Sequence, residues 1–224
     1  MKKLLLLHGA LGSKDQFKEL TKKLNGSYEI YSLNFSGHGG SVIPKEPFSM
    51  DMFAGNIISY LNDNSINEID VFGYSMGGYA ALHTAINFPE RIGKIFTLAT
   101  KFEWTPEIAE RETVMLDAEK IKQKVPKFAE ELALRHGENN WVRVLGKTTE
   151  MMRDLGAGEP MLFGNIKNEV LVGIGDRDKM VTLEETITAY RSLPNSKLLV
   201  LPGTPHPLEM VDAERLAREI KSFF

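Results

Sequence analysis

Short runs of apolar residues alternate along the chain with longer stretches in which apolar and polar residues are mixed. Most of the short runs are continuously apolar, which is typical of strands buried on both faces of a parallel sheet. Six of them are expected to be strands: Leu4–Leu7, Tyr28–Leu33, Ile69–Phe72, Ile92–Leu98, Val170–Ile174 and Leu198–Leu201. Helices are expected between them, at Lys14–Leu24, Met50–Asn62, Met76–Phe88, Leu183–Ser192 and Leu208–Phe223. This order predicts the α/β class, with a doubly wound, mostly parallel six-stranded sheet flanked by helices.

The alternation of predicted strands and helices is interrupted between Thr100 and Asn168, where no strand-like run occurs. A crossover between parallel strands needs only about a dozen residues, so this segment contains an insertion. Apolar residues at helical spacing predict two or three amphipathic helices there: Phe128, Leu132, Trp141, Val144, Leu145, Thr148, Met152 and Leu155. The apolar stripe either packs on the core or contacts a substrate. We therefore expect a single domain, residues 1–224, with residues 101–165 as a helical lid.

The amino-acid composition argues against several classes of function. The 224 residues are 42% hydrophobic and 25% charged, which fits one globular domain with a sizeable core. A net charge of −3, with both signs interspersed, argues against a nucleic-acid partner. The chain has no cysteine, which excludes disulfides and thiolate metal sites and makes a cytoplasmic location the default expectation. No apolar run reaches the roughly 18 residues of a membrane span, so no membrane partner is expected.

Ser75 is the strongest candidate for chemistry. It lies in the sequence GYSMGG, directly after the apolar run Ile69–Phe72 and before a predicted helix. Gly73 and Gly77, two residues away on either side, would let Ser75 occupy a strained strand-to-helix turn, because neither glycine has a Cβ. The unsatisfied N–H groups of the following helix would stabilise an anion beside it. The pattern predicts a serine nucleophile that attacks a carbonyl carbon.

A serine hydroxyl needs a base, and that base is usually a histidine held by a carboxylate. His206 follows the last predicted strand, in the loop GTPHP, which places it at the same edge of the sheet as Ser75. His8 and His38 also lie near this edge, but position and chain order favour His206.

The orienting carboxylate is expected at the end of another strand. The sequence GDRD after the fifth predicted strand supplies both Asp176 and Asp178, and their spacing does not choose between them. For the oxyanion, the expected donors are the backbone N–H of Met76 and one N–H of the loop HGALG after the first strand.

The segments HGALG, SGHGGS, GYSMGG and GDRD, followed by a late loop histidine, together resemble the α/β-hydrolase fold superfamily over most of the chain. The resemblance implies Asp178 as the acid, because the family's acid closes a Gly-x-x-Asp pattern. It also implies Ala10 as the second oxyanion donor, after the His-Gly pair. One departure is that Pro205 and Pro207 flank His206 where relatives often have a glycine, which implies a stiffer loop.

The resemblance implies a serine hydrolase acting on a carboxylic ester or thioester of a small, apolar substrate, with no cofactor and no metal. Ser75 would attack, His206 would relay the proton and Asp178 would orient His206. Apolar contacts to the substrate are expected from residues of the lid, namely Phe102, Trp104, Phe128, Trp141, Met151 and Met152. The alternatives are lactone or carbon–carbon bond hydrolysis, a lyase reaction, or a binding module without turnover.

Overall fold

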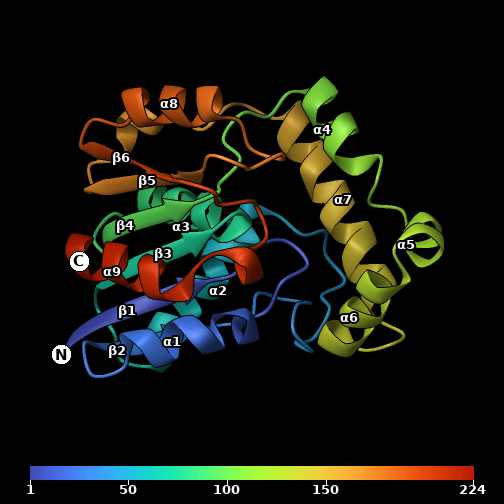
Figure 1. The fold of residues 1–224 in the computed structure, drawn as a ribbon, viewed down its shortest axis with the longest axis horizontal. Helices are drawn as coiled ribbons and strands as arrows, with labels where there is room; N and C mark the ends of the chain where they lie inside the picture. The colour runs from blue at the N-terminus through green and yellow to red at the C-terminus, as the bar shows by residue number, and fades with distance from the viewer.

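The computed structural model describes residues 1–224 and contains one parallel sheet with the strand order β2-β1-β3-β4-β5-β6 (Figure 1). All five neighbouring pairs run parallel. The strands are β1 (Lys2–Leu7), β2 (Tyr28–Ser32), β3 (Ile69–Tyr74), β4 (Ile92–Leu98), β5 (Val170–Gly175) and β6 (Ser196–Leu201). The prediction of a six-stranded, doubly wound α/β sheet is confirmed.

Five helices cover the two faces of the sheet: α1 (Lys18–Leu24), α2 (Met50–Asp63), α3 (Met76–Asn87), α8 (Leu183–Ser192) and α9 (Ala213–Phe223). The first and last are shorter than predicted, because a 3-10 helix precedes each: η1 (Lys14–Phe17) and η3 (Leu208–Met210). At the last helix the reason is local. The Asp212 side chain accepts hydrogen bonds from the N–H groups of Glu214 and Arg215, so α9 begins at Ala213.

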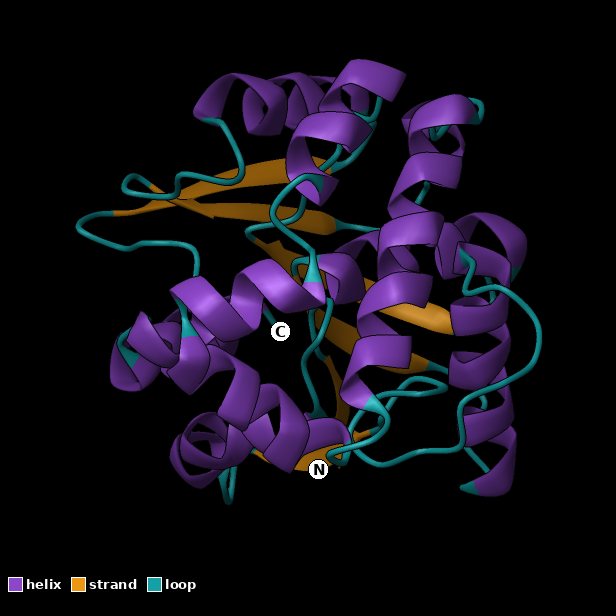
Figure 2. Ribbon diagram, turned by 90° about the vertical axis from the view of Figure 1, so that its right-hand side faces the viewer, coloured by secondary structure: helices purple, strands orange, loops and turns teal.

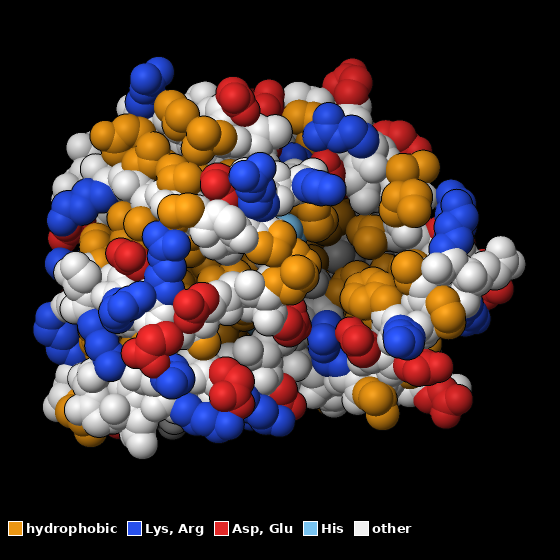
Figure 3. All heavy atoms as spheres, viewed as in Figure 1, with side chains coloured by type: hydrophobic (Ala, Val, Ile, Leu, Met, Phe, Trp, Pro, Cys, Tyr) orange, Lys and Arg blue, Asp and Glu red, His pale blue; other side chains and the backbone are white.

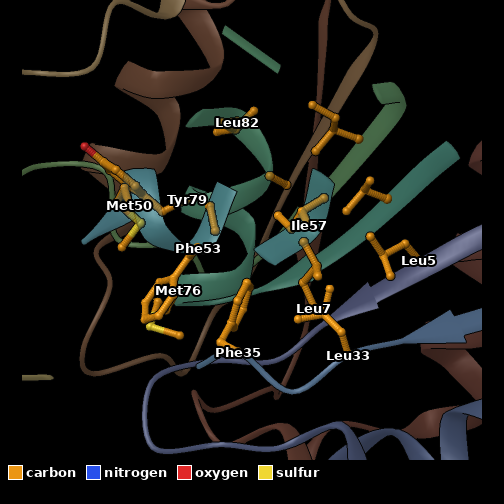
Figure 4. Packing of buried hydrophobic residues seen from close by; sticks show 14 of the residues in the cluster. Leu5, Leu7, Leu33, Phe35, Met50, Phe53, Ile57, Met76, Tyr79 and Leu82 are labelled. Atoms are coloured by element: carbon orange, nitrogen blue, oxygen red, sulfur yellow. The ribbon is translucent and has the colours of Figure 1, made fainter. Parts of the chain in front are cut away.

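The four consecutive leucines of β1, Leu4–Leu7, show why the inner strands of the sheet contain continuous apolar runs. Leu5 and Leu7 belong to the cluster that includes α2 and α3, whereas Leu4 and Leu6 belong to the cluster on the opposite face, with α1 and α9. Figure 4 shows Leu5 and Leu7 packed with residues of the first cluster. None of the four has any exposed surface. Burial on both faces removes the alternation that a half-exposed strand would show.

Residues 101–165 form a helical insertion between β4 and β5. It contains α4 (Pro106–Thr113), α5 (Ala118–Lys124), α6 (Pro126–His136), α7 (Trp141–Ala157) and the 3-10 helix η2 (Phe163–Asn165). The insertion has four α-helices where two or three were expected. The predicted apolar residues lie on α6 and α7, whereas α4 buries only Ala109 and Thr113 and α5 only Ile121, so neither has an apolar stripe to detect. Figure 1 shows the insertion beyond the carboxyl ends of the strands, and Figure 2 shows its helices in front of the sheet.

The strand order places a crevice between the ends of β1 and β3. The chain leaves β1 toward β2 on one side and continues with β3 on the other, so the loops after β1 and β3 diverge there. Ligands of open α/β sheets bind at such a point. No helix combines the length and hydrophobicity needed to cross a bilayer.

Candidate active site

Ser75 forms the turn between β3 and α3 in a strained backbone conformation, with φ 51° and ψ −119°. Such angles are uncommon for a residue other than glycine and persist only where the surroundings impose them. A Cβ on Gly73 would lie 2.5 Å from Gly78 Cα, and one on Gly77 would lie 2.3 Å from the Leu7 carbonyl oxygen. The two glycines therefore allow α3 to approach β1 and β3, and the predicted strand-to-helix turn is confirmed.

His206 and Asp178 form a direct hydrogen bond, 2.7 Å from Nδ1 to Oδ2. The Asp178 side chain has no exposed surface, and its Oδ1 accepts hydrogen bonds from the N–H groups of Met180 and Val181, at 2.8 and 2.9 Å. Burial acts to raise the pKa of Asp178, but the hydrogen bond and charge of His206 and the two backbone donors hold that pKa below its ordinary value. The site thus keeps Asp178 ionised.

Asp176 does not contact His206. Its Oδ1 accepts a 3.3 Å hydrogen bond from the N–H of Thr204 and lies 3.9 Å from Arg177 Nε, with the side chain 37% exposed. Of the two carboxylates that the sequence left open, Asp178 is the one brought to His206. Asp176 supports the backbone of the loop that carries the histidine.

Ser75 and His206 line the same cavity, although no hydrogen bond joins their side chains. Catalytic hydrogen bonds are often long in ligand-free enzymes and shorten when substrate binds. Tyr74, next to Ser75, donates a 2.9 Å hydrogen bond from its hydroxyl to the carbonyl of His206. This contact attaches the histidine loop to the turn that carries the serine.

The loop after β1 also reaches Ser75. A Cβ on Gly9 would lie 3.1 Å from Ser75 Cβ, so the backbone before Ala10 passes close to the serine. Met76 is the first residue of α3, whose first-turn N–H groups have no partner within the helix. Met76 follows Ser75 and Ala10 follows Gly9, so the two predicted oxyanion donors belong to backbone segments that adjoin the serine, and both residues line the cavity.

The cavity has a volume of about 680 Å³ and lies between the ends of the strands and the helical insertion (Figure 3). Fifteen of its 24 lining residues are hydrophobic, so it suits an apolar ligand. The lining prediction is confirmed for Trp104, Phe128, Met151 and Met152. It is wrong for Phe102 and Trp141, whose side chains pack in the core.

His8 and His38, the other histidines expected near this edge, are fully buried and do not line the cavity. His8 Nε2 accepts a hydrogen bond from the N–H of Phe35, and burial lowers the pKa of His8 to about 4. Burial likewise lowers the pKa of His38 well below its ordinary value. Both are neutral structural groups. No group of three or more His, Asp or Glu side chains is placed to hold a metal ion.

Sequence reasoning missed Arg135 and His136, at the end of α6. Both contact the carbonyl oxygen of Leu11, in the loop that carries Ala10. No local sequence pattern predicts this contact, because it joins residues more than 120 positions apart.

Comparison with known proteins agrees with this architecture. The family model for the alpha/beta hydrolase fold matches residues 2–153, more than half of the chain. The chain belongs to the alpha/beta hydrolase fold family.

Individual relatives are distant. An abhydrolase domain-containing protein of Schizosaccharomyces pombe is 30% identical over 93 residues, which are 41% of this chain and only 34% of that protein. The pimeloyl-[acyl-carrier protein] methyl ester esterase of Neisseria meningitidis serogroup C is 22% identical over 100% of this chain and 93% of its own. The solved structure of an alpha/beta hydrolase enzyme from a Medee basin deep-sea metagenome library superimposes with a TM-score of 0.85 at 14% identity, covering 100% of this chain and 89% of that one. At this identity the structural likeness shows the fold alone.

Proposed function

We propose that the protein is a serine hydrolase that cleaves a carboxylic ester or thioester of a small, apolar substrate through an acyl-enzyme intermediate. The observation that carries the proposal is the 2.7 Å hydrogen bond between His206 and the buried Asp178, in a cavity that Ser75 also lines. A nucleophile, a base and a group that orients the base are the parts that acyl transfer requires.

In the proposed reaction, Ser75 Oγ attacks the carbonyl carbon while His206 Nε2 accepts the hydroxyl proton. The carbonyl oxygen becomes an oxyanion, which the N–H groups of Met76 and Ala10 stabilise. The tetrahedral intermediate collapses, the bond to the alcohol or thiol breaks, and His206 returns its proton to that leaving group. A water molecule, deprotonated by His206, then attacks the acyl-enzyme carbonyl. The bond to Ser75 Oγ breaks as His206 returns the proton to that oxygen, which releases the acid and regenerates the free Ser75 hydroxyl.

Two further observations support an ester with an apolar group. The apolar side chains of Trp104, Phe128, Met151 and Met152 face the cavity from the helical insertion, which would act as a lid over a bound acyl chain or alcohol. The relative from Neisseria meningitidis is named as a methyl ester esterase and aligns along the whole chain.

The test is hydrolysis of p-nitrophenyl esters, from acetate to long acyl chains, by the wild-type protein and by Ser75→Ala and His206→Ala. Each substitution should reduce turnover by on the order of 10³-fold or more. Thermal unfolding of the variants checks that they are folded. Equal turnover by the wild type and Ser75→Ala, or no turnover by either, would contradict the proposal.

A further inference from the structure

The last two residues of α6 reach from the helical insertion to the loop after β1. Arg135 Nη1 donates a 2.8 Å hydrogen bond to the carbonyl oxygen of Leu11, and His136 Nε2 lies 2.9 Å from the same oxygen. His136 is 1% exposed, and the Arg135 side chain is 19% exposed. We call this pair, Arg135 and His136, the loop clamp.

The contacts of His136 define its protonation. A carbonyl oxygen can only accept, so Nε2 carries the proton and donates it to Leu11. Nδ1 accepts a 3.0 Å hydrogen bond from the N–H of Gly39, so it carries no proton. Burial lowers the pKa of His136 to about 4, which keeps the ring neutral. One neutral side chain of the insertion thus joins the loop after β1 to the loop after β2.

Leu11 needs such support. It has a φ of 56° and is the third residue of a turn closed by a 3.1 Å hydrogen bond from the N–H of Gly12 to the carbonyl of Gly9. Glycine is preferred at a position with this φ, and a branched residue there must be held by its surroundings. The two donors of the loop clamp occupy the carbonyl of Leu11 and thereby fix its peptide group.

The loop clamp also contacts the side of the site that carries His206. Arg135 Nη2 lies 3.8 Å from Glu209 Oε1, and the same oxygen accepts a 2.7 Å hydrogen bond from Gln16 Nε2. Glu209 follows His206 by three residues. The end of α6 therefore connects the loops on both sides of the cavity.

We propose that Arg135 and His136 are positioning residues. They hold the Leu11–Gly12 peptide, whose N–H donates to the Gly9 carbonyl, and the Gly9–Ala10 peptide is thereby oriented so that the N–H of Ala10 points at the oxyanion. The inference rests on the proposed function, because it needs an oxyanion beside Ser75. The proposal implies that the N–H of Ala10 is correctly placed only while the end of α6 contacts the loop after β1.

Two substitutions of His136 separate its two hydrogen bonds. A glutamine can place an N–H near the position of Nε2, whereas an asparagine can place its oxygen near the position of Nδ1. We expect kcat for a p-nitrophenyl ester to fall about 10- to 100-fold in His136→Asn, with KM within about twofold of wild type, because a misdirected oxyanion donor affects the transition state more than the bound substrate. His136→Gln should restore most of kcat.

Arg135→Met provides a second test at a side chain that is partly exposed and easier to replace. It should show the same fall in kcat at constant KM, and it should weaken inhibition by phenylboronic acid, whose tetrahedral adduct with Ser75 resembles the transition state. Arg153→Met is the matched control, because Arg153 lies on α7 with its side chain 54% exposed, outside the cavity. It should leave both measurements unchanged.

Hydrogen exchange tests the loop clamp independently of the proposed function. The N–H of Gly12 should exchange faster in His136→Asn than in the wild type, whereas the N–H of Gly39 should exchange faster in His136→Gln, whether or not the protein hydrolyses esters. Absence of turnover in the wild type would overturn the proposed function and, with it, the role at the oxyanion. Normal kcat and normal exchange in both His136→Asn and Arg135→Met would contradict the positioning role of the loop clamp while leaving the proposed function intact. A rise in KM alone in Arg135→Met would also contradict it, because Arg135 would then be a substrate contact.

Discussion

His206 Nδ1 and Asp178 Oδ2 are 2.7 Å apart, and the Asp178 carboxylate is completely buried behind the histidine. In the proposed reaction, an ionised carboxylate in this position fixes the ring so that Nε2 is left to act as the base. It also stabilises the imidazolium that would form during the reaction.

The two aspartates of the GDRD sequence should therefore differ in their effect on activity. Asp178→Asn should reduce kcat by on the order of 10²- to 10⁴-fold, because an amide cannot stabilise the imidazolium. Asp176→Asn, which changes only a loop contact to Thr204, should stay within about threefold of wild type. Ester hydrolysis by the two variants measures the difference, and the reverse ranking would make Asp176 the acid.

The buried histidines predict a loss of stability in acid. The pKa values of His8 and His136 are lowered by burial to about 4, whereas an unfolded histidine titrates near 6.5. Between about pH 6.5 and pH 4 the unfolded chain binds more protons, so the free energy of unfolding should fall as the pH falls. The shift at His8 alone corresponds to about 3 kcal/mol. Urea unfolding at pH 7, 6, 5 and 4.5 measures the slope, and a flat profile would contradict the prediction.

His38 offers a variant that tests the cause of this slope. Its ring lies 5.4 Å from that of Phe48 and 5.9 Å from that of Phe53, and its Nε2 has no hydrogen-bond partner. His38→Phe retains a ring in this aromatic setting but loses the 3.1 Å hydrogen bond from Nδ1 to the Ser36 carbonyl, so it should lower the free energy of unfolding at pH 7 by about 1–3 kcal/mol. The loss below pH 6 should become shallower, since one fewer buried histidine must stay neutral. An unchanged slope would assign the acid sensitivity to other groups.

The close approach of α3 to β1 predicts that Gly77 tolerates no side chain. Gly77→Ala would place a Cβ 2.3 Å from the Leu7 carbonyl oxygen and should lower the free energy of unfolding by about 1–3 kcal/mol or more. Gly55→Ala in α2 is the matched control, because a Cβ there meets no atom within 4 Å. It should raise stability by up to about 1 kcal/mol. Thermal and urea unfolding compare the two, and equal effects would contradict the steric explanation.

The lining of the cavity predicts a preference for apolar acyl groups. Met152→Gln keeps the length of the side chain but makes the wall polar, and should reduce kcat/KM for an octanoate ester about tenfold more than for acetate. Met115→Gln, at a residue of the insertion that is 56% exposed and outside the cavity, is the matched control. If both esters respond equally to Met152→Gln, the acyl group does not contact this wall.

Much of the fold follows from local rules that the sequence displays. Continuous apolar runs such as Leu4–Leu7 are buried on both faces wherever a parallel sheet is covered by helices, so they predicted the strands and the class of fold. The turn at Ser75 was also predictable, because the glycines that allow its strained backbone lie within two residues of it. Steric rules of this kind act over a few residues, and a sequence shows them directly.

Only the tertiary structure decided which distant groups meet. It brought Asp178 rather than Asp176 to His206, turned Phe102 and Trp141 into the core instead of the cavity, and placed His136 against Leu11. These outcomes depend on how the insertion and the loops after several strands pack together, which no short segment specifies. Residue type and local spacing therefore determined the strands and the serine turn, whereas the direction of each side chain around them was determined by packing between elements far apart in the chain.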